Sequence, residues 1–291
     1  MHYKRKEFIR MGGNLAAAFA LAPVAGKFFV NGHEKDKLDK FGIQLWTVKK
    51  ALAKDPQGVL KQLADDGYKQ IESFEGDKGM FWGMTPADFK KYVDDLGMTT
   101  ISSHCNDIYK DSFEKKAADA GSIGLKYLIS PSESGAKTID DFKKLADRFN
   151  QCGEICKKNG LLFGYHNHSA IFKSIDNQLP LDILLANTNK DTVTYEMDIY
   201  WVITAKQDPK EWLKKYKDRF RLCHIKDRIK GSTEEDASCI LGEGSIDFPK
   251  IIKTAKENGI QYYIVEQERY DHTTEMDSAK ADAEYLKKFK F

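Results

Sequence analysis

The chain alternates between short runs of apolar residues and longer charged segments in which apolar residues recur at helical spacing. Short apolar runs are typical of buried strands, and recurrence every three to four residues is typical of amphipathic helices. Strands are predicted over Phe41–Thr47, Lys69–Phe74, Met98–His104, Lys126–Ser130, Leu161–His168, Thr192–Ile199, Arg219–Lys226 and Gln261–Gln267. Helices are predicted between them, among others over Gln57–Asp66, Pro86–Leu96, Ile139–Lys158, Pro209–Lys217 and Phe248–Asn258.

Eight strand–helix units follow one another in about 250 residues, which is the usual size of a (β/α)₈ barrel. Glycines such as Gly67 and Gly160 stand between a predicted helix and the next strand, where glycine commonly ends a helix. The sequence therefore predicts an α/β fold made of a single barrel domain over residues 41–291. A doubly wound open sheet is the alternative.

The first forty residues have a different character. Four basic residues, Lys4, Arg5, Lys6 and Arg10, precede a weakly charged stretch, Met11–Gly26, that is rich in Ala and Leu. This layout predicts an export signal of the twin-arginine type, with Lys4 in the place of the first arginine, followed by a polar linker. The protein is then periplasmic or otherwise exported. The alternative is an amphipathic N-terminal helix of a cytoplasmic protein.

Composition excludes several classes of protein. The chain has 291 residues, with 46 Lys and Arg against 44 Asp and Glu, and this balance does not indicate a nucleic-acid partner. The apolar run near the N-terminus is shorter than the 20 or so residues that span a membrane, so no stable membrane anchor is expected. The five cysteines lack the spacing of a disulfide framework.

Polar residues stand at the ends of the last four predicted strands. Since strand side chains alternate between two faces, residues two apart share a face. Four such pairs occur: His166 with His168, Glu196 with Asp198, His224 with Lys226, and Glu266 with Glu268. The carboxyl ends of barrel strands carry the catalytic groups of such enzymes, so these pairs predict an active site.

A metal site is predicted from one member of each pair. His166, Asp198, His224 and Glu266 come from four successive strands and offer two imidazoles and two carboxylates. This donor set suits one divalent ion of Mn, Co, Zn or Fe and contains too much nitrogen for Ca²⁺. For any single histidine, a buried structural role or a substrate contact is the alternative.

The chain resembles the xylose-isomerase-like superfamily of sugar phosphate isomerases and epimerases. The motifs that carry the resemblance are GYHNH, YEMDIYW, CHIKD, LGEGSIDF and IVEQE, all within the barrel. In ketose 3-epimerases of this superfamily, Glu, Asp, His and Glu at the ends of strands five to eight hold a metal. The intervals from His166 to Asp198 and on to His224 are similar to that pattern, which favours His166 over His168 as the first ligand. The longer interval to Glu266 is consistent with an inserted loop.

One departure from the epimerases bears on mechanism. Their strand-five ligand is a glutamate that also moves a proton, and here the position is His166. The YHNH version is similar to a branch that includes lyases and hydratases. The resemblance therefore implies a divalent-metal-dependent sugar isomerase or epimerase that abstracts a proton next to a carbonyl. The alternatives are a lyase or hydratase acting on a keto-sugar or 3-keto-glycoside, and a sugar-binding barrel without catalysis.

The resemblance makes Glu266 the first candidate for the general base. His104, His168 and Glu72 are alternatives with free side chains. Lys226 is a candidate catalytic residue that holds a substrate oxygen or lowers the pKa of a neighbour. Its alternative is an ordinary lysine at the barrel rim.

Further residues are predicted to bind the substrate. Trp46 and Trp201 offer aromatic faces for a sugar ring, and the alternative is core packing. Glu72 and Glu268 lie at strand ends, and Glu243 stands between two glycines that either admit a ligand or form a tight turn. No cluster of Lys and Arg predicts a phosphate pocket. The expected partner is thus a small unphosphorylated carbohydrate, and a homodimer is compatible with the sequence.

Overall fold

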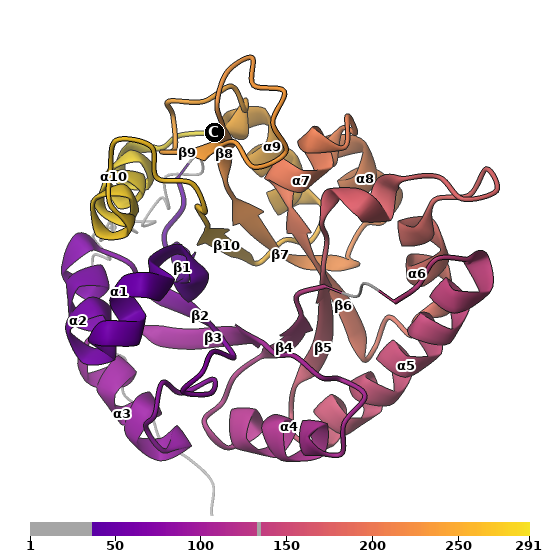
Figure 1. Ribbon diagram of the computed structural model, residues 1–291, viewed down its shortest axis with the longest axis horizontal. Coiled ribbons are helices and arrows are strands. Elements are labelled where there is room, and N and C mark those ends of the chain that lie inside the picture. The colour runs from indigo at the N-terminus through magenta and orange to yellow at the C-terminus, as the bar shows by residue number, and fades with distance from the viewer. Residues whose placement is uncertain (1–36, 133–134) are drawn as a thin grey trace, which may run out of the picture. The chain divides into compact units, whose positions relative to one another are not determined.

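A computed structural model describes residues 37–132 and 135–291. Eight parallel strands close into a barrel in the order β1-β10-β7-β6-β5-β4-β3-β2, which confirms the predicted barrel (Figure 1). The strands are β1 (Gly42–Gln44), β2 (Gln70–Phe74), β3 (Thr99–His104), β4 (Tyr127–Ser130), β5 (Leu162–His166), β6 (Val193–Asp198), β7 (Phe220–Ile225) and β10 (Tyr262–Val265). All but the last four residues of the predicted export signal and linker lie outside the described residues.

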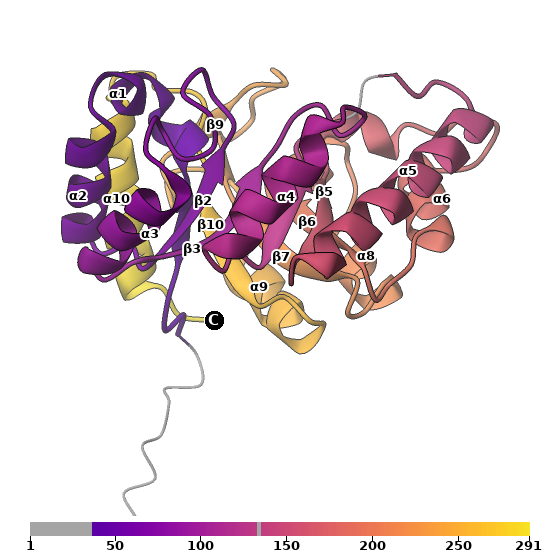
Figure 2. The same ribbon diagram turned by 90° about the horizontal axis from the view of Figure 1, so that it is seen from below.

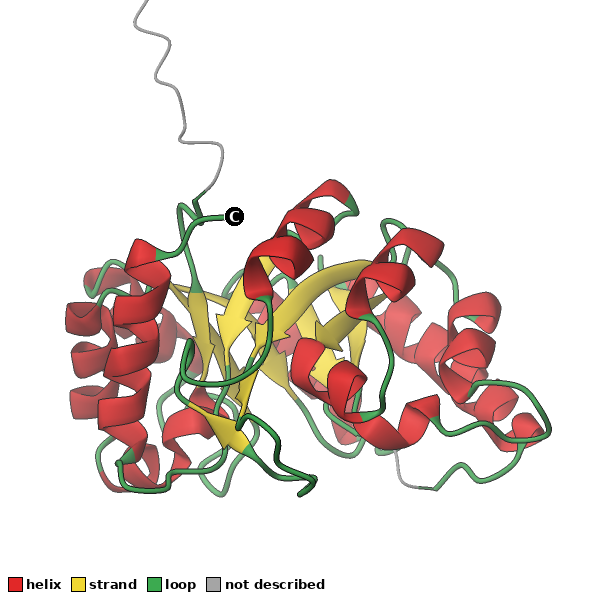
Figure 3. Cartoon of the chain, turned by 90° about the horizontal axis from the view of Figure 1, so that it is seen from above, coloured by secondary structure: helices red, strands yellow, loops and turns green. Residues whose placement is uncertain are grey.

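Helices cover the outside of the barrel, as Figures 2 and 3 show. They are α1 (Lys49–Lys54), α2 (Pro56–Asp66), α3 (Pro86–Asp95), α4 (Ser112–Ser122), α5 (Ile139–Lys158), α6 (Pro180–Asn187), α7 (Ile199–Thr204), α8 (Pro209–Lys215), α9 (Phe248–Glu257) and α10 (Glu275–Lys288). Two 3₁₀ helices, η1 (Leu45–Val48) and η2 (Ser169–Phe172), follow β1 and β5. Five of the α-helices have proline in their first turn, where its missing N–H leaves no bond unmade.

The interior of the barrel changes from apolar to polar along the strands. A separate cluster of buried apolar side chains comes from β3, β4, β7 and β10: Ile101, Tyr127, Ile129, Leu222 and Ile264. Gly164 leaves room for Ile129, whose side chain would lie 2.9 Å from a Cβ at this position. Two residues after Gly164 and Leu222, on the same strand faces, stand His166 and His224. The apolar cluster therefore forms the floor beneath the polar strand ends.

Two register shifts occur next to buried acidic residues. β2 and β3 lose register between Ile71 and Glu72, and β6 and β7 do so between Tyr195 and Glu196. Such bulges redirect side chains, and they are frequent beside active sites. Both Glu72 and Glu196 are fully buried.

A small antiparallel pair, β8 (Asp227–Arg228) with β9 (Ser238–Cys239), lies beyond β7. The segment that follows it leads to α9.

The five cysteines are free thiols, and four of them are buried. Within residues 37–132 and 135–291, no helix has both the length and the apolar character needed to cross a membrane.

Candidate active site

Four side chains of the metal-ligand type converge at the carboxyl ends of β5, β6, β7 and β10. His166 Nε2 lies 4.0 Å from Asp198 Oδ2, and His224 Nδ1 lies 3.8 Å from the same oxygen. His224 Nδ1 is also 3.3 Å from Oε2 of Glu266. One ligand atom from each of the four residues falls within 4.8 Å of the others, and all four residues are buried. The structure thus brings together the four residues that the sequence proposes as metal ligands.

The bonding of Asp198 tests whether this group fits a metal ion. Its Oδ1 accepts a hydrogen bond from the backbone N–H of Trp201 at 2.9 Å, which caps α7 and orients the carboxylate. Its Oδ2 is buried and has no hydrogen-bond partner among the described residues. Ligands at about 2.0–2.2 Å from a shared ion lie about 3–4.4 Å apart. The distances of 4.0, 3.8 and 3.3 Å given above fall in this range. The unpartnered oxygen and the mixed N/O donor set therefore fit a divalent transition-metal ion.

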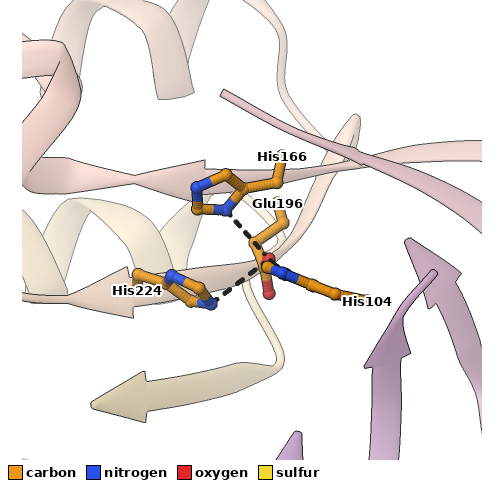
Figure 4. A group of neighbouring side chains, drawn as sticks. All are labelled: His104, His166, Glu196 and His224. Atoms are coloured by element: carbon orange, nitrogen blue, oxygen red, sulfur yellow. Dashed lines mark hydrogen bonds and ion pairs between the residues drawn. The ribbon is translucent and has the colours of Figure 1, made fainter. Parts of the chain in front are cut away.

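The opposite ring nitrogens of the two histidines face a second layer of acidic groups (Figure 4). Oε2 of Glu196 lies 3.1 Å from His166 Nδ1, 3.2 Å from His224 Nε2 and 2.9 Å from His104 Nε2. Oε1 of Glu72 lies 2.7 Å from His224 Nε2 and 3.1 Å from His104 Nε2. The sequence analysis did not assign a role to Glu196.

The negative charges in this layer oppose the effect of burial on the pKa values of two histidines. Burial alone would lower the pKa of His104, but the carboxylates of Glu72 and Glu196 raise it to about 10. Burial likewise works against a charged His224, and the negative charges of Glu196 and Glu266 raise its pKa well above the ordinary value. Without a bound cation, the imidazoles of His104 and His224 therefore carry positive charge that balances the acidic side chains.

Lys226 is a fully buried lysine beside the candidate metal ligands. Its Nζ is 3.3 Å from Oε2 of Glu266 and forms an ion pair with Glu268. The ammonium group also lies 5.0 Å and 4.9 Å from the ring centroids of Tyr200 and Trp201. Although burial lowers the pKa of Lys226, the nearby carboxylates outweigh burial and the net shift is upward. Lys226 therefore stays charged and fixes both glutamates.

A cavity of about 290 Å³ opens above these groups. Its lining includes six residues that the sequence proposes for the site: Trp46, His104, His166, His168, Glu266 and Glu268. The other lining residues are Phe74, Glu75, Asn106, Pro131 and Ser132. The volume is close to the lower end of the range for small-molecule sites, about 300–1,000 Å³.

His168 differs from the other histidines of the site. Within the described chain, neither of its ring nitrogens has a hydrogen-bond partner, and the ring contacts those of His166 and Trp201. Burial and the neighbouring His166 lower the pKa of His168 to about 3. The imidazole is therefore neutral and unengaged at the cavity wall. Across from it, burial and the charge of Glu266 raise the pKa of Glu268.

Three predicted substrate-binding residues do not line the cavity. Glu72 is fully buried in the acidic layer, where its two carboxylate oxygens also accept bonds from Gln44 and Ser102. Trp201 is buried behind His168 and Lys226. Glu243 is exposed and lies beside residues of α10. The glycines around it serve a turn, because the N–H groups of Gly242 and Gly244 bind the carboxylate of Asp227 at 2.9 and 3.1 Å.

Residues 60–289 match the family described as xylose isomerase-like TIM barrel. The chain belongs to this family. A solved structure of a sugar phosphate isomerase/epimerase from Parabacteroides distasonis is 33% identical, with a TM-score of 0.73. The similarity covers 84% of this chain and 92% of that one.

Other proteins to which the chain is similar carry other names. An inosose dehydratase from Clostridium perfringens is 27% identical over 146 residues, and the match spans only about half of its length, 48%, and 45% of this chain. A structure of the IOLI protein with a bound zinc atom has a TM-score of 0.69 over 86% of this chain and 99% of that one. Its identity of 16% shows a shared fold alone.

Proposed function

We propose that the protein is a divalent-metal-dependent carbohydrate isomerase or epimerase that removes a proton from the carbon next to a carbonyl group. One observation carries the proposal: Asp198 Oδ2, buried and without a partner, is surrounded by His166, His224 and Glu266 at the base of a cavity. The similarity to the Parabacteroides distasonis isomerase/epimerase supports the reaction class. The zinc atom reported for the IOLI protein supports the kind of cofactor.

The four residues His166, Asp198, His224 and Glu266 would hold the metal ion. When bound, such an ion supplies a Lewis acid that polarises a carbonyl oxygen and stabilises negative charge that develops on it. Mn, Co, Zn and Fe all suit the two nitrogens and two oxygens. Lys226 and the acidic layer keep these side chains in place.

His168 and Glu268 are the residues that we assign to proton transfer. Each has an atom at the cavity, and neither belongs to the four-residue metal site. β5 and β10 are separated by β6 and β7 in the barrel, so His168 and Glu268 approach a substrate from different sides. His168 would accept a proton on a free ring nitrogen, and Glu268 would return one from the other side.

The rim of the cavity is suited to a sugar ring. Trp46 is 38% exposed, and its ring meets Phe74 edge-on at 5.0 Å. Aromatic faces of this kind pack against the apolar C–H surface of a sugar. No Lys or Arg occurs among the described residues that line the cavity, which supports an unphosphorylated carbohydrate as substrate.

A lyase or hydratase acting on a keto-sugar or 3-keto-glycoside is the second candidate. Nδ1 of His166 faces Glu196 at 3.1 Å, and Nε2 would bind the metal ion beside Asp198. His166 is therefore unable to act as the second proton-transfer group that a glutamate supplies in the ketose 3-epimerases. The similarity to inosose dehydratase supports elimination of water as this second candidate.

Incubation in D₂O with a panel of ketoses and 3-keto-glycosides, in the presence of Mn²⁺ or Co²⁺, separates these reactions. Deuterium incorporation with a new stereoisomer or a shifted carbonyl supports the isomerase or epimerase. Loss of water or of an aglycone supports the second candidate. Tight binding without turnover would contradict both and leave a sugar-binding protein.

Metal analysis and one variant test the assignments of the residues. The purified wild type should contain about one transition-metal ion per chain, and Asp198→Ala should contain almost none. His168→Gln should keep the metal and lose about 10²- to 10⁴-fold in kcat, because it removes the proposed base. Glu243→Gln is the matched control, since Glu243 lies outside the cavity. Full metal content in Asp198→Ala would overturn the assigned site.

A further inference from the structure

We infer that Glu196 is a positioning residue that determines which nitrogen of His166 and of His224 faces the cation site. The inference rests on the metal site of the proposed function and adds a residue outside it. Glu196 lies two residues before Asp198 on β6, so both carboxylates point into the barrel from one strand. Asp198 faces one pair of ring nitrogens, and Glu196 faces the opposite pair.

The geometry assigns the protons. Oε2 of Glu196 lies at hydrogen-bond distance from three ring nitrogens: His166 Nδ1, His224 Nε2 and His104 Nε2 (Figure 4). An ionised carboxylate only accepts hydrogen bonds, so the nitrogens facing it carry protons. Metal binding requires neutral imidazoles, each with one N–H and one lone pair, so in the metal-bound protein the lone pairs of His166 Nε2 and His224 Nδ1 are left for the cation site on the Asp198 side.

Glu72 reinforces this arrangement at one of the two rings. Its Oε1 is 2.7 Å from His224 Nε2, so that nitrogen faces two carboxylates. Among the described residues, Glu196 supplies the only carboxylate within 4.0 Å of His166 Nδ1. Loss of Glu196 would therefore free the ring of His166 more than the ring of His224.

The same geometry argues against a second cation in the acidic layer. His104, His166, Glu196 and His224 also form a buried group of ligand-type residues. A cation there would need the lone pairs of His166 Nδ1 and His224 Nε2, and a neutral ring would then present N–H groups to the first site. The two groups share two rings and compete for them. The group on the Asp198 side contains two carboxylates, Asp198 and Glu266, whereas the other contains Glu196 alone, and this favours one ion on the Asp198 side.

Cobalt binding to Glu196→Gln tests the inference. The second carboxylate oxygen of Glu196, Oε1, has no hydrogen-bond partner in the described chain, so an amide NH₂ placed there meets no opposing N–H group. We expect Co²⁺ affinity, measured by chelator competition, to fall about 10- to 100-fold, as is usual for loss of an outer carboxylate partner. The visible Co²⁺ spectrum should change as well, because the ring of His166 is no longer fixed.

Glu75→Gln is the matched control. Glu75 is another carboxylate at the same cavity, but it binds Asn106 N and Lys116 Nζ, each at 2.8 Å, and no histidine. The Glu75→Gln substitution removes one negative charge near the site. It should change Co²⁺ affinity less than about threefold, which is well below the usual effect of losing a carboxylate that contacts a metal ligand. A fall as large as that of Glu196→Gln would reduce the role of Glu196 to general electrostatics and overturn the inference.

The number of Co²⁺ ions bound per chain is the second measurement that tests the inference. The wild type and His104→Gln should each bind one Co²⁺ per chain. Two ions in the wild type and one in His104→Gln would show a cation in the acidic layer and overturn the inference, as would unchanged affinity in Glu196→Gln. Circular dichroism of the metal-free variants checks that they fold. If Glu196→Gln does not fold, the number of ions bound by the wild type and by His104→Gln still tests the inference. Normal metal binding without turnover would count against the proposed function alone.

Discussion

At the scale of single residues, Lys226 has the largest predicted effect on stability. It is fully buried between Glu266 and Glu268. Lys226→Met leaves two acidic groups without their cation, and breaking a buried ion pair from one side costs about 3–5 kcal/mol. Urea unfolding at neutral pH should show a loss of this size. Lys250→Met is the control, since Lys250 pairs with Asp247 at the surface and should cost less than about 1 kcal/mol.

The convergence of the four candidate ligands was predictable from sequence because their strand positions are regular. His166, Asp198 and His224 each close a strand or stand one residue before its end, where alternation decides the face. Glu196 shares that face, but sequence spacing does not tell which of two adjacent carboxylates meets the ligand nitrogens. The bulge beside Glu196 and the contact with His104 on β3 are tertiary features. The same holds for Glu72. Alternation predicts that its side chain points into the barrel, but it does not predict how far below the cavity the carboxylate lies.

At the scale of elements, Asp227 organises the segment between β8 and α9. Its carboxylate accepts backbone N–H groups from Arg228, Gly242, Gly244 and Ile246. A Cβ on Gly244 would lie 2.2 Å from Asp227 Oδ1, so glycine permits this close approach. Asp227→Asn turns one acceptor into a donor that faces N–H groups. The cost should be about 2–3 kcal/mol, with faster proteolysis within residues 228–247.

Limited proteolysis followed by mass spectrometry checks this prediction, and Asp236→Asn serves as control because its side chain is exposed in the same segment. Equal cleavage rates in both variants would contradict the assigned role of Asp227. The glycines that flank Glu243 predict either a nearby ligand or a tight turn. The pattern of two glycines identifies a tight backbone, but it does not say whether a ligand or, as here, a carboxylate of the same chain comes close.

Element boundaries departed from the prediction where local capping ends a strand. The strand predicted over Phe41–Thr47 stops at Gln44, because its side chain accepts the N–H of Trp46 and starts η1. The strand predicted over Thr192–Ile199 stops at Asp198, which caps α7. In each case an apolar run continues past the strand, so periodicity alone does not mark the end. The early end of β1 places Trp46 at the cavity rim.

At the scale of the whole molecule, the repeat of strand and helix was sufficient to predict the barrel, and the family match agrees with it. The closing pair, β1 with β10, joins segments more than 200 residues apart and follows from eight units in succession. Export stays a prediction. N-terminal sequencing of periplasmic protein should find a start well after Met1, and an intact Met1 would contradict it.

The pH dependence of stability provides a test in a different part of the barrel. Asp282 on α10 is buried, and its Oδ1 accepts the N–H of Leu241 at 2.8 Å, while Oδ2 has no partner in the described chain. Burial raises the pKa of Asp282 to about 8, and the charges of Asp227 and Glu243 act in the same direction, while the bond from Leu241 opposes them. The folded protein thus holds a proton that the unfolded chain, with an aspartate pKa of about 3.9, releases earlier.

This proton makes the free energy of unfolding fall as pH rises from about 4 to about 8, by up to about 1.4 kcal/mol per pH unit. The stabilisation is complete below the unfolded pKa and lost above the folded one. Asp282→Asn cannot ionise, so its stability relative to the wild type should increase from pH 5 to about pH 8 in urea titrations and then level off. Glu284→Gln, an exposed acidic position on the same helix, should show no such trend. A constant difference between Asp282→Asn and the wild type would mean that Asp282 is ionised in the folded protein throughout this range.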